Sequence, residues 1–82
     1  MGDLQQAKQY HEKALNIHTA KLGSNHVYVA MSYNNLGRVH QDLGDLHQAK
    51  QYYEKALNIR TEKLGSNHVY VATSYNNLGR VH

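Results

Sequence analysis

The sequence predicts an all-α protein in which tandem antiparallel helical hairpins form one small domain over residues 1–82. The first observation is an internal repeat, because residues 2–40 align with residues 44–82 and differ at only five of 39 positions. The second is that apolar residues recur every three or four positions, as on one face of a helix. The third is that proline is absent and the breaks between these patterns fall at glycines. A chain of this length forms a single modest core.

The first helix is expected over about residues 3–22. Asp3 is a suitable N-cap, and Gln6 follows three residues later in a box-like arrangement. Apolar and small residues form two rows along this segment, so we expect the helix to pack on two sides. Gly23 follows Leu22 and suits the backbone reversal that ends a helix.

The second helix is expected over about residues 26–43, with Ser24 or Asn25 as its N-cap. Gly37 lies inside this segment, where glycine costs about 1 kcal/mol of helix propensity. We therefore expect a neighbouring helix to approach closely at Gly37. The apolar stripe of this helix comprises Val29, Tyr33, Leu36, His40 and Leu43.

The third and fourth helices, over about residues 45–64 and 68–82, repeat the first and second. Asp45 and Gln48 repeat the predicted cap at Asp3. The connections are short, and short connections between long helices make neighbouring helices antiparallel. The sequence therefore predicts a stack in which one hairpin design is used twice. By this alignment Met1 and Gly2 belong to a turn, and the chain begins within a repeat.

A set of residues from the middle of the chain matches a known repeat pattern: Tyr33, Leu36, Gly37, His40, Ala49, Tyr53 and Ala56. At this spacing they resemble the tetratricopeptide repeat, and the 42-residue period is most similar to the repeats of kinesin light chains. The resemblance implies a short right-handed superhelical stack of four helices. It also implies that the helices follow the order second, first, second, first type. Valine follows His26 and His68, where the family usually has proline.

Composition argues against several other classes of protein. The nine Lys and Arg residues are scattered among six acidic residues, whereas a nucleic-acid interface gathers its basic residues on one face. No apolar stretch approaches the roughly 20 residues that span a bilayer. We therefore expect no nucleic-acid or membrane partner, and a cytoplasmic protein.

The residues predict neither a metal site nor catalysis. There is no cysteine, and His11 and His18 are seven residues apart, too far for two ligands of one zinc ion on a helix. The sequence contains no nucleophile elbow, no glycine-rich phosphate loop and no separate pair of carboxylates. We expect no catalytic residue, no cofactor and no enzymatic activity.

One candidate function is peptide binding by a monomer. The resemblance implies that first-type helices line a concave groove. Asparagines there would hydrogen-bond an extended peptide, and arginines would hold acidic side chains or a C-terminal carboxylate. The alternative is that the same row is only a solvated helix face. The residues of this candidate groove are Met31, Asn34, Arg38, Gln41, Thr73, Asn76 and Arg80.

The preferred function is a non-enzymatic protein-interaction scaffold that associates with itself. The first helix lacks a first-type neighbour and the last helix lacks a second-type neighbour, so the two exposed faces are complementary. We expect a homo-oligomer, either a dimer or an open head-to-tail assembly. The near-identity of the copies suggests a two-repeat fragment produced by recent duplication or by design. The predicted contact residues are Leu4, Ala7, His11, Ala14, Tyr75 and Leu78.

Overall fold

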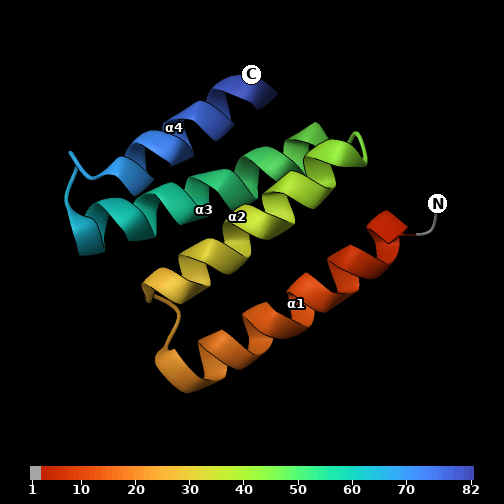
Figure 1. Cartoon of the computed structure of the whole chain (residues 1–82), viewed down its shortest axis with the longest axis horizontal. Coiled ribbons are helices and arrows are strands. Elements are labelled where there is room, and N and C mark those ends of the chain that lie inside the picture. The colour runs from red at the N-terminus through yellow and green to blue at the C-terminus, as the bar shows by residue number, and fades with distance from the viewer. Residues whose placement is uncertain (1–2) are drawn as a thin grey trace.

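The computed structural model describes residues 3–82, and within them it contains four α-helices packed side by side in chain order (Figure 1). The turn expected at Met1 and Gly2 lies outside the described residues. The prediction of an all-α, tetratricopeptide-like stack of four helices is confirmed. The helices are α1 (Asp3–Leu22), α2 (Val27–Asp42), α3 (Leu46–Leu64) and α4 (Val69–Val81).

Histidines, rather than the expected serine or asparagine, cap the helices α2 and α4. The Nδ1 atom of His26 accepts a hydrogen bond from the Tyr28 amide at 3.1 Å, and His68 does the same for Tyr70 at 3.0 Å. The backbone of His26 is extended, which brings its ring beside the first free amide groups of α2. Ser24 and Asn25 lie in the preceding turn, and the Asn25 side chain donates to Glu62 Oε1 instead, at 2.6 Å. The prediction that Ser24 or Asn25 caps α2 is therefore wrong.

The predicted cap at Asp45 and the predicted glycine ends of the first and third helices are present in the structure. Asp45 caps α3, and its Oδ1 atom accepts from the Gln48 amide at 3.3 Å. Gly23 and Gly65 follow α1 and α3 with φ angles of 89° and 92°. Such positive φ angles are readily adopted only by glycine. The same residue types therefore end the equivalent helix in both copies.

The core lies mainly between α2 and α3. Val29 and Ala30 of α2 pack with Ala56 and Ile59 of α3, and Leu15 and Tyr33 pack against this cluster. Helix α1 contains no buried residue. Within residues 3–82 its main packing partner is α2, so the expectation that α1 is covered on two sides does not hold for the described residues.

Gly37 lies against the ring of Tyr53. A β-carbon at Gly37 would lie 2.7 Å from Tyr53 Cε1 and 2.8 Å from Cδ1. The close helix approach predicted at Gly37 is therefore confirmed. Gly79, the equivalent residue in α4, has no such neighbour within 4 Å of its would-be β-carbon.

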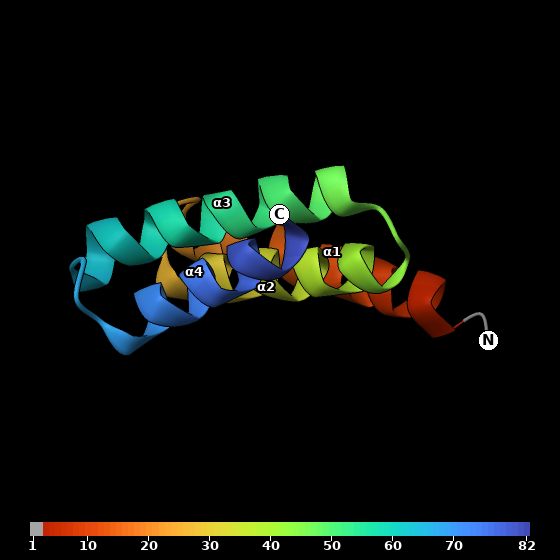
Figure 2. The same cartoon turned by 90° about the horizontal axis from the view of Figure 1, so that it is seen from above.

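Helices α2 and α4 lie in one layer and α3 lies in another (Figure 2). Seen from above, α3 runs along one side of the stack, with α2 and α4 on its other side (Figure 2). Helices α2 and α4, which begin with the same sequence, thus lie on the same side of α3.

Candidate interaction surfaces

The contact between α2 and α3 shows how two helices of this repeat pack. The rings of Tyr33 and Tyr52 stack with their centroids 5.9 Å apart. The ammonium group of Lys55 lies 5.3 Å from the centre of the Tyr33 ring, a cation–π geometry. Ala49 and Ala56 of α3 are completely buried. We call this arrangement the α2–α3 contact.

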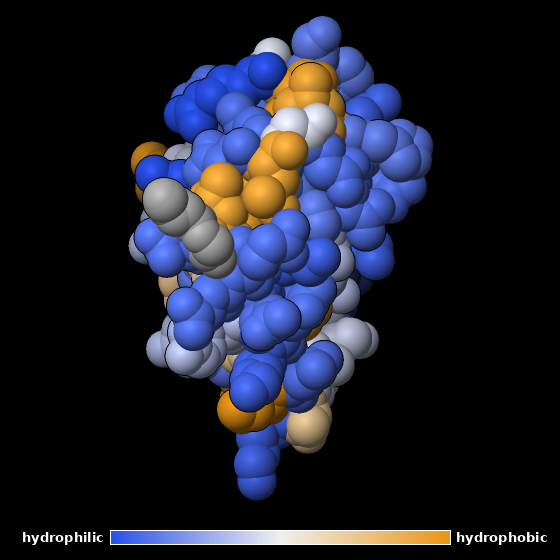
Figure 3. Space-filling model, turned by 90° about the vertical axis from the view of Figure 1, so that its right-hand side faces the viewer, coloured by the Kyte–Doolittle hydropathy of each residue, from blue (hydrophilic) through white to orange (hydrophobic). Residues whose placement is uncertain are grey.

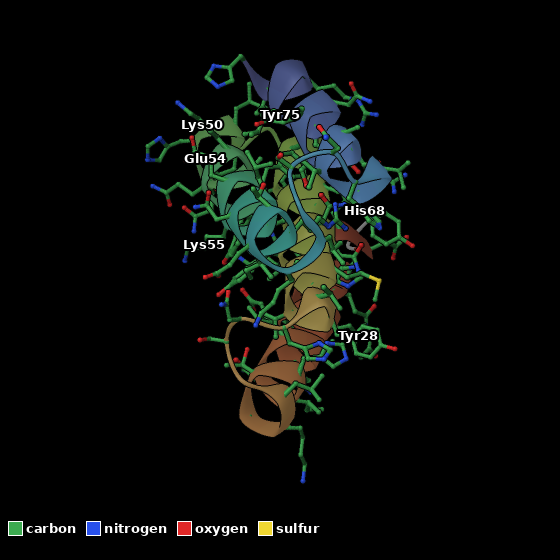
Figure 4. The ribbon with its side chains drawn as sticks, turned by 90° about the vertical axis from the view of Figure 1, so that its left-hand side faces the viewer. Tyr28, Lys50, Glu54, Lys55, His68 and Tyr75 are labelled. Atoms are coloured by element: carbon green, nitrogen blue, oxygen red, sulfur yellow. The ribbon has the colours of Figure 1, made fainter. Side chains whose placement is uncertain are left out.

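The same residue types stand exposed at the two ends of the stack. Tyr75 is equivalent to Tyr33 and is 60% exposed on α4, where it is labelled in Figure 4. Tyr10 is equivalent to Tyr52 and is 62% exposed on α1. Tyr75 and Tyr10 therefore each lack, within the described chain, the stacked ring that their counterparts have.

The other predicted self-association residues lie on these two faces. Ala7 and Ala14 are half-buried on α1, although their equivalents in α3 are fully buried. Leu78 of α4 is likewise half-buried, whereas Leu36 is fully buried. The half-buried His11 takes the place of Tyr53.

Leu4 occupies a more marginal position than the other predicted contact residues. It is 37% exposed, but its equivalent Leu46 is 48% exposed even with the α2–α3 contact complete. Figure 3 views the end of the molecule where α1 begins and shows a group of apolar side chains on an otherwise mostly hydrophilic surface. Leu4 and Leu46 both belong to helix starts, where a neighbouring helix covers little.

Two residues of the predicted groove already have partners within the fold. Asn34 Oδ1 accepts a hydrogen bond from Asn77 Nδ2 at 2.7 Å, which joins α2 to α4. Gln41 Oε1 accepts from the Tyr53 hydroxyl at 2.8 Å, which joins α2 to α3. Asn77 is buried and was not singled out from the sequence. The adjacent asparagines at positions 34–35 and 76–77, which recur in both copies, were the feature of the sequence that could have identified Asn77.

The other groove candidates are exposed: Met31, Arg38, Thr73, Asn76 and Arg80. The Thr73 hydroxyl donates to the Val69 carbonyl oxygen at 3.2 Å, within α4. The structure thus separates the predicted row into a half-buried part that links helices and a part that faces solvent.

Arg60 is a buried cation that the sequence reasoning did not select. Its side chain extends from α3 to α4, where Nη1 donates to Ser74 Oγ at 3.0 Å and to the Tyr70 carbonyl oxygen at 3.3 Å. The guanidinium carbon lies 5.4 Å from the centre of the Tyr70 ring. Burial lowers the pKa of Arg60. The signal in the sequence was that position 60 is one of the five differences between the copies, with His18 as its counterpart.

Two hollows open on the surface. One, of about 310 Å³, lies at the turn between α1 and α2, beside Lys63. The other, of about 220 Å³, lies between α2, α3 and α4, and we call it the Arg60 pocket. Its lining residues are Val27, Tyr28, Met31, Arg60, Leu64 and Tyr70.

Residues 3–82 contain neither a cluster of metal ligands nor a helix that could span a membrane. In that part of the chain, no three His, Asp or Glu side chains gather closely enough to hold a metal ion. None of the four helices described there has the length and apolar character needed to cross a membrane.

Comparison with known proteins gives one family. The model of the tetratricopeptide repeat matches residues 1–62 and, in a second overlapping register, residues 28–82. No curated protein matches the chain. The two matches overlap in the hairpin of α2 and α3.

Proposed function

Because the chain belongs to the tetratricopeptide-repeat family, which suggests a protein–protein interaction module, we propose that it acts by binding and not by catalysis, and that one copy binds another. In this proposal α1 of one copy packs on the outer face of α4 of the next. We call this arrangement the head-to-tail contact.

The observation that carries the proposal is the stacked pair of Tyr33 and Tyr52. Its unpaired equivalents, Tyr75 and Tyr10, are exposed on opposite ends of the same chain. Packing α1 on α4 in the geometry of the α2–α3 contact would stack Tyr10 on Tyr75. An aromatic pair of this kind stabilises a contact beyond the area that it buries.

Two further pairs fit the same geometry. The space beside Gly79 is open, and His11 holds the place of the tyrosine that fills the space beside Gly37. Lys13 is equivalent to Lys55 and would lie over Tyr75, as Lys55 lies over Tyr33. Tyr33, Tyr52, Lys55, Ala49 and Ala56 of the α2–α3 contact thus have the same residue type at the chain ends, whereas Tyr53 is replaced by His11.

The contact is expected to be weak and to depend on concentration. Burying a few apolar side chains favours association, but the loss of translational and rotational freedom opposes it by a similar amount. His11 is also smaller and more polar than Tyr53, so the head-to-tail contact fills the space beside Gly79 less completely. Since the two faces differ, association continues as an open chain of copies unless it closes into a ring, or a swap of elements gives a dimer.

The alternative is a monomer that binds a peptide in the groove of its first-type helices. The exposure of Arg38, Asn76 and Arg80 supports this alternative. Asn34 and Gln41 support it less, because their side-chain oxygens already accept hydrogen bonds from Asn77 and Tyr53.

Nuclear magnetic resonance during dilution tests the proposal. The ring signals of Tyr10 and Tyr75 should shift together as the protein is diluted, because both rings leave the same contact. Tyr28 is also about half exposed but lies outside the contact, so its signals should stay unchanged. Constant signals from Tyr10 and Tyr75 at all concentrations would contradict the proposal, and so would equal shifts of all three rings.

A further inference from the structure

Among the six predicted self-association residues, His11 is the one whose side chain can change its charge near neutral pH. It is half-buried on α1, whereas its equivalent in α3, Tyr53, is 1% exposed. Tyr53 is covered because its ring lies against Gly37 of α2. In the head-to-tail contact His11 would lie against Gly79 of the neighbouring copy, where the space is open in the single chain. Association would therefore remove much of the His11 ring from water.

The position that Tyr53 occupies is exposed to two positive charges. Burial raises the pKa of the Tyr53 phenol, the charges of Arg80 and Arg38 oppose that rise, and Asp42 adds to it. Arg38 belongs to α2 and Arg80 to α4. A side chain at this position of α3 therefore faces an arginine from each of the two helices between which α3 packs.

Helix α1 packs on α2 in the way that α3 packs on α4. His18 Nδ1 lies 3.0 Å from Ser32 Oγ, and the equivalent Arg60 Nη1 donates to Ser74 Oγ, also at 3.0 Å. Residues of α2 therefore stand to α1 as the equivalent residues of α4 stand to α3.

His11 would consequently face an arginine on each side of the head-to-tail contact. Arg38 of its own copy is equivalent to Arg80, and Arg80 of the neighbouring copy is equivalent to Arg38. Asp42, which offsets the arginines at Tyr53, has no equivalent among the 82 residues. Both arginines are exposed, so water screens their repulsion, and the removal of the ring from water is the larger effect.

We propose that protonation of His11 weakens the head-to-tail contact, so that copies which associate at about pH 8 separate in mild acid. This inference rests on the proposed contact and adds its regulation. A charged ring would be buried between two guanidinium groups, and a buried charge without an opposite partner is costly. In the separate chain the half-buried ring keeps its access to water. The contact is thus at full strength above the ordinary pKa of histidine and weakens as pH falls through it.

A second histidine of the contact acts in the opposite direction. His40 Nδ1 lies 3.4 Å from Asp45 Oδ2, and the His40 ring lies 5.4 Å from that of Tyr52. The equivalent pair in the head-to-tail contact is His82 of one copy and Asp3 of the next. Protonation of His82 would strengthen this pair, although an ion pair that is exposed to water contributes little. The two effects are separated by comparing chains that differ at residue 11 alone.

The experiment is sedimentation equilibrium of the whole chain at pH 8 and at pH 5.5, which gives the association constant at each pH. His11→Gln keeps a polar side chain that stays neutral at both values. The first copy supplies the matched control, because His47 is exposed on α3 and its counterpart is Gln5. His47→Gln therefore removes one histidine from a helix that takes no part in the head-to-tail contact.

The acid effect is the ratio of the association constants at pH 8 and pH 5.5. It should be about tenfold larger in the unmodified chain than in His11→Gln, because pH 5.5 lies about one unit below the ordinary histidine pKa of about 6.5. His47→Gln should show the same acid effect as the unmodified chain. The other histidines, His82 included, are common to the unmodified chain and His11→Gln, so their contributions cancel in this comparison.

Two results would overturn this inference alone. One is the same acid effect, within about twofold, in the unmodified chain and His11→Gln. The other is an equal loss of the acid effect in His47→Gln, which would indicate a response to overall charge. A monomer at every concentration at pH 8 would instead contradict the head-to-tail contact, and this inference with it.

Discussion

Gly37 and Tyr53 pack so closely that a β-carbon on residue 37 would lie 2.7 Å from the Tyr53 ring. This pair determines how near α2 and α3 can approach. Gly79 has the same surrounding sequence, but no neighbouring helix lies beside it. Substitutions at the two glycines therefore separate the effect of a neighbouring helix on stability from the effect of helix propensity on stability.

Replacing each glycine by alanine should change stability in opposite directions. Alanine improves helix propensity by about 1 kcal/mol, and Gly79→Ala should raise the free energy of unfolding by up to that amount. At Gly37 the same gain is opposed by overpacking against Tyr53, which costs about 1–3 kcal/mol. We expect the two variants to differ by about 2 kcal/mol in urea unfolding at low protein concentration. Equal changes in the two variants would show that the approach of Tyr53 costs nothing.

Tyr53 should make stability fall at alkaline pH. Burial raises the pKa of the Tyr53 phenol above the ordinary value of tyrosine, because the charged form is poorly solvated. The unfolded chain therefore loses this proton at a lower pH than the folded chain, and stability declines as pH rises from about 10 through the folded pKa. Urea unfolding across this pH range should show a shallower decline for Tyr53→Phe than for the unmodified chain.

The same substitution has a separate effect near neutral pH. Tyr53→Phe removes the donor to Gln41 Oε1 and should cost about 0.5–1.5 kcal/mol. Tyr75→Phe serves as the control, because Tyr75 is exposed and should tolerate the loss of its hydroxyl group. Equal costs at both positions would mean that the hydrogen bond from Tyr53 to Gln41 contributes nothing specific to stability.

The histidine cap of α4 should be replaceable by a better-known capping residue. His68→Ala removes the acceptor for the Tyr70 amide and should lower the free energy of unfolding by about 0.5–2 kcal/mol. Asparagine can accept from the same region of the helix, so His68→Asn should restore most of that loss. Thermal unfolding followed by circular dichroism measures both effects. A His68→Ala variant as stable as the unmodified chain would show that the cap is dispensable.

Local features of the fold were predictable from sequence, whereas partners between helices were less so. The helices and their glycine ends follow from periodicity and from backbone preferences, which depend on nearby residues. The caps of α2 and α4 were missed because serine and asparagine are the commoner caps, while the extended backbone of His26 decides the geometry. Gly37 was an exception among long-range features, because a helical glycine already implies a close neighbour.

In the candidate surfaces, too, the contacts between helices could not be predicted from the sequence. Spacing along α2 placed Asn34 and Gln41 with Arg38 in one row, but it could not indicate that Asn77 and Tyr53 would donate to two of them. These bonds depend on how the helices are placed against one another. Arg60 is one of the nine scattered basic residues of the sequence, and its position between α3 and α4 makes it a buried charge.

Light scattering after size-exclusion chromatography, over a series of protein concentrations, tests the head-to-tail contact most directly. The mass of the unmodified chain should rise with concentration. Gly79→Leu should remain a monomer, because its side chain fills the space that α1 of the next copy needs. Thr73→Met is the matched control, since the first copy has an exposed methionine at this position, and it should associate like the unmodified chain. A constant monomer mass for the unmodified chain, or an unchanged rise in Gly79→Leu, would contradict the account.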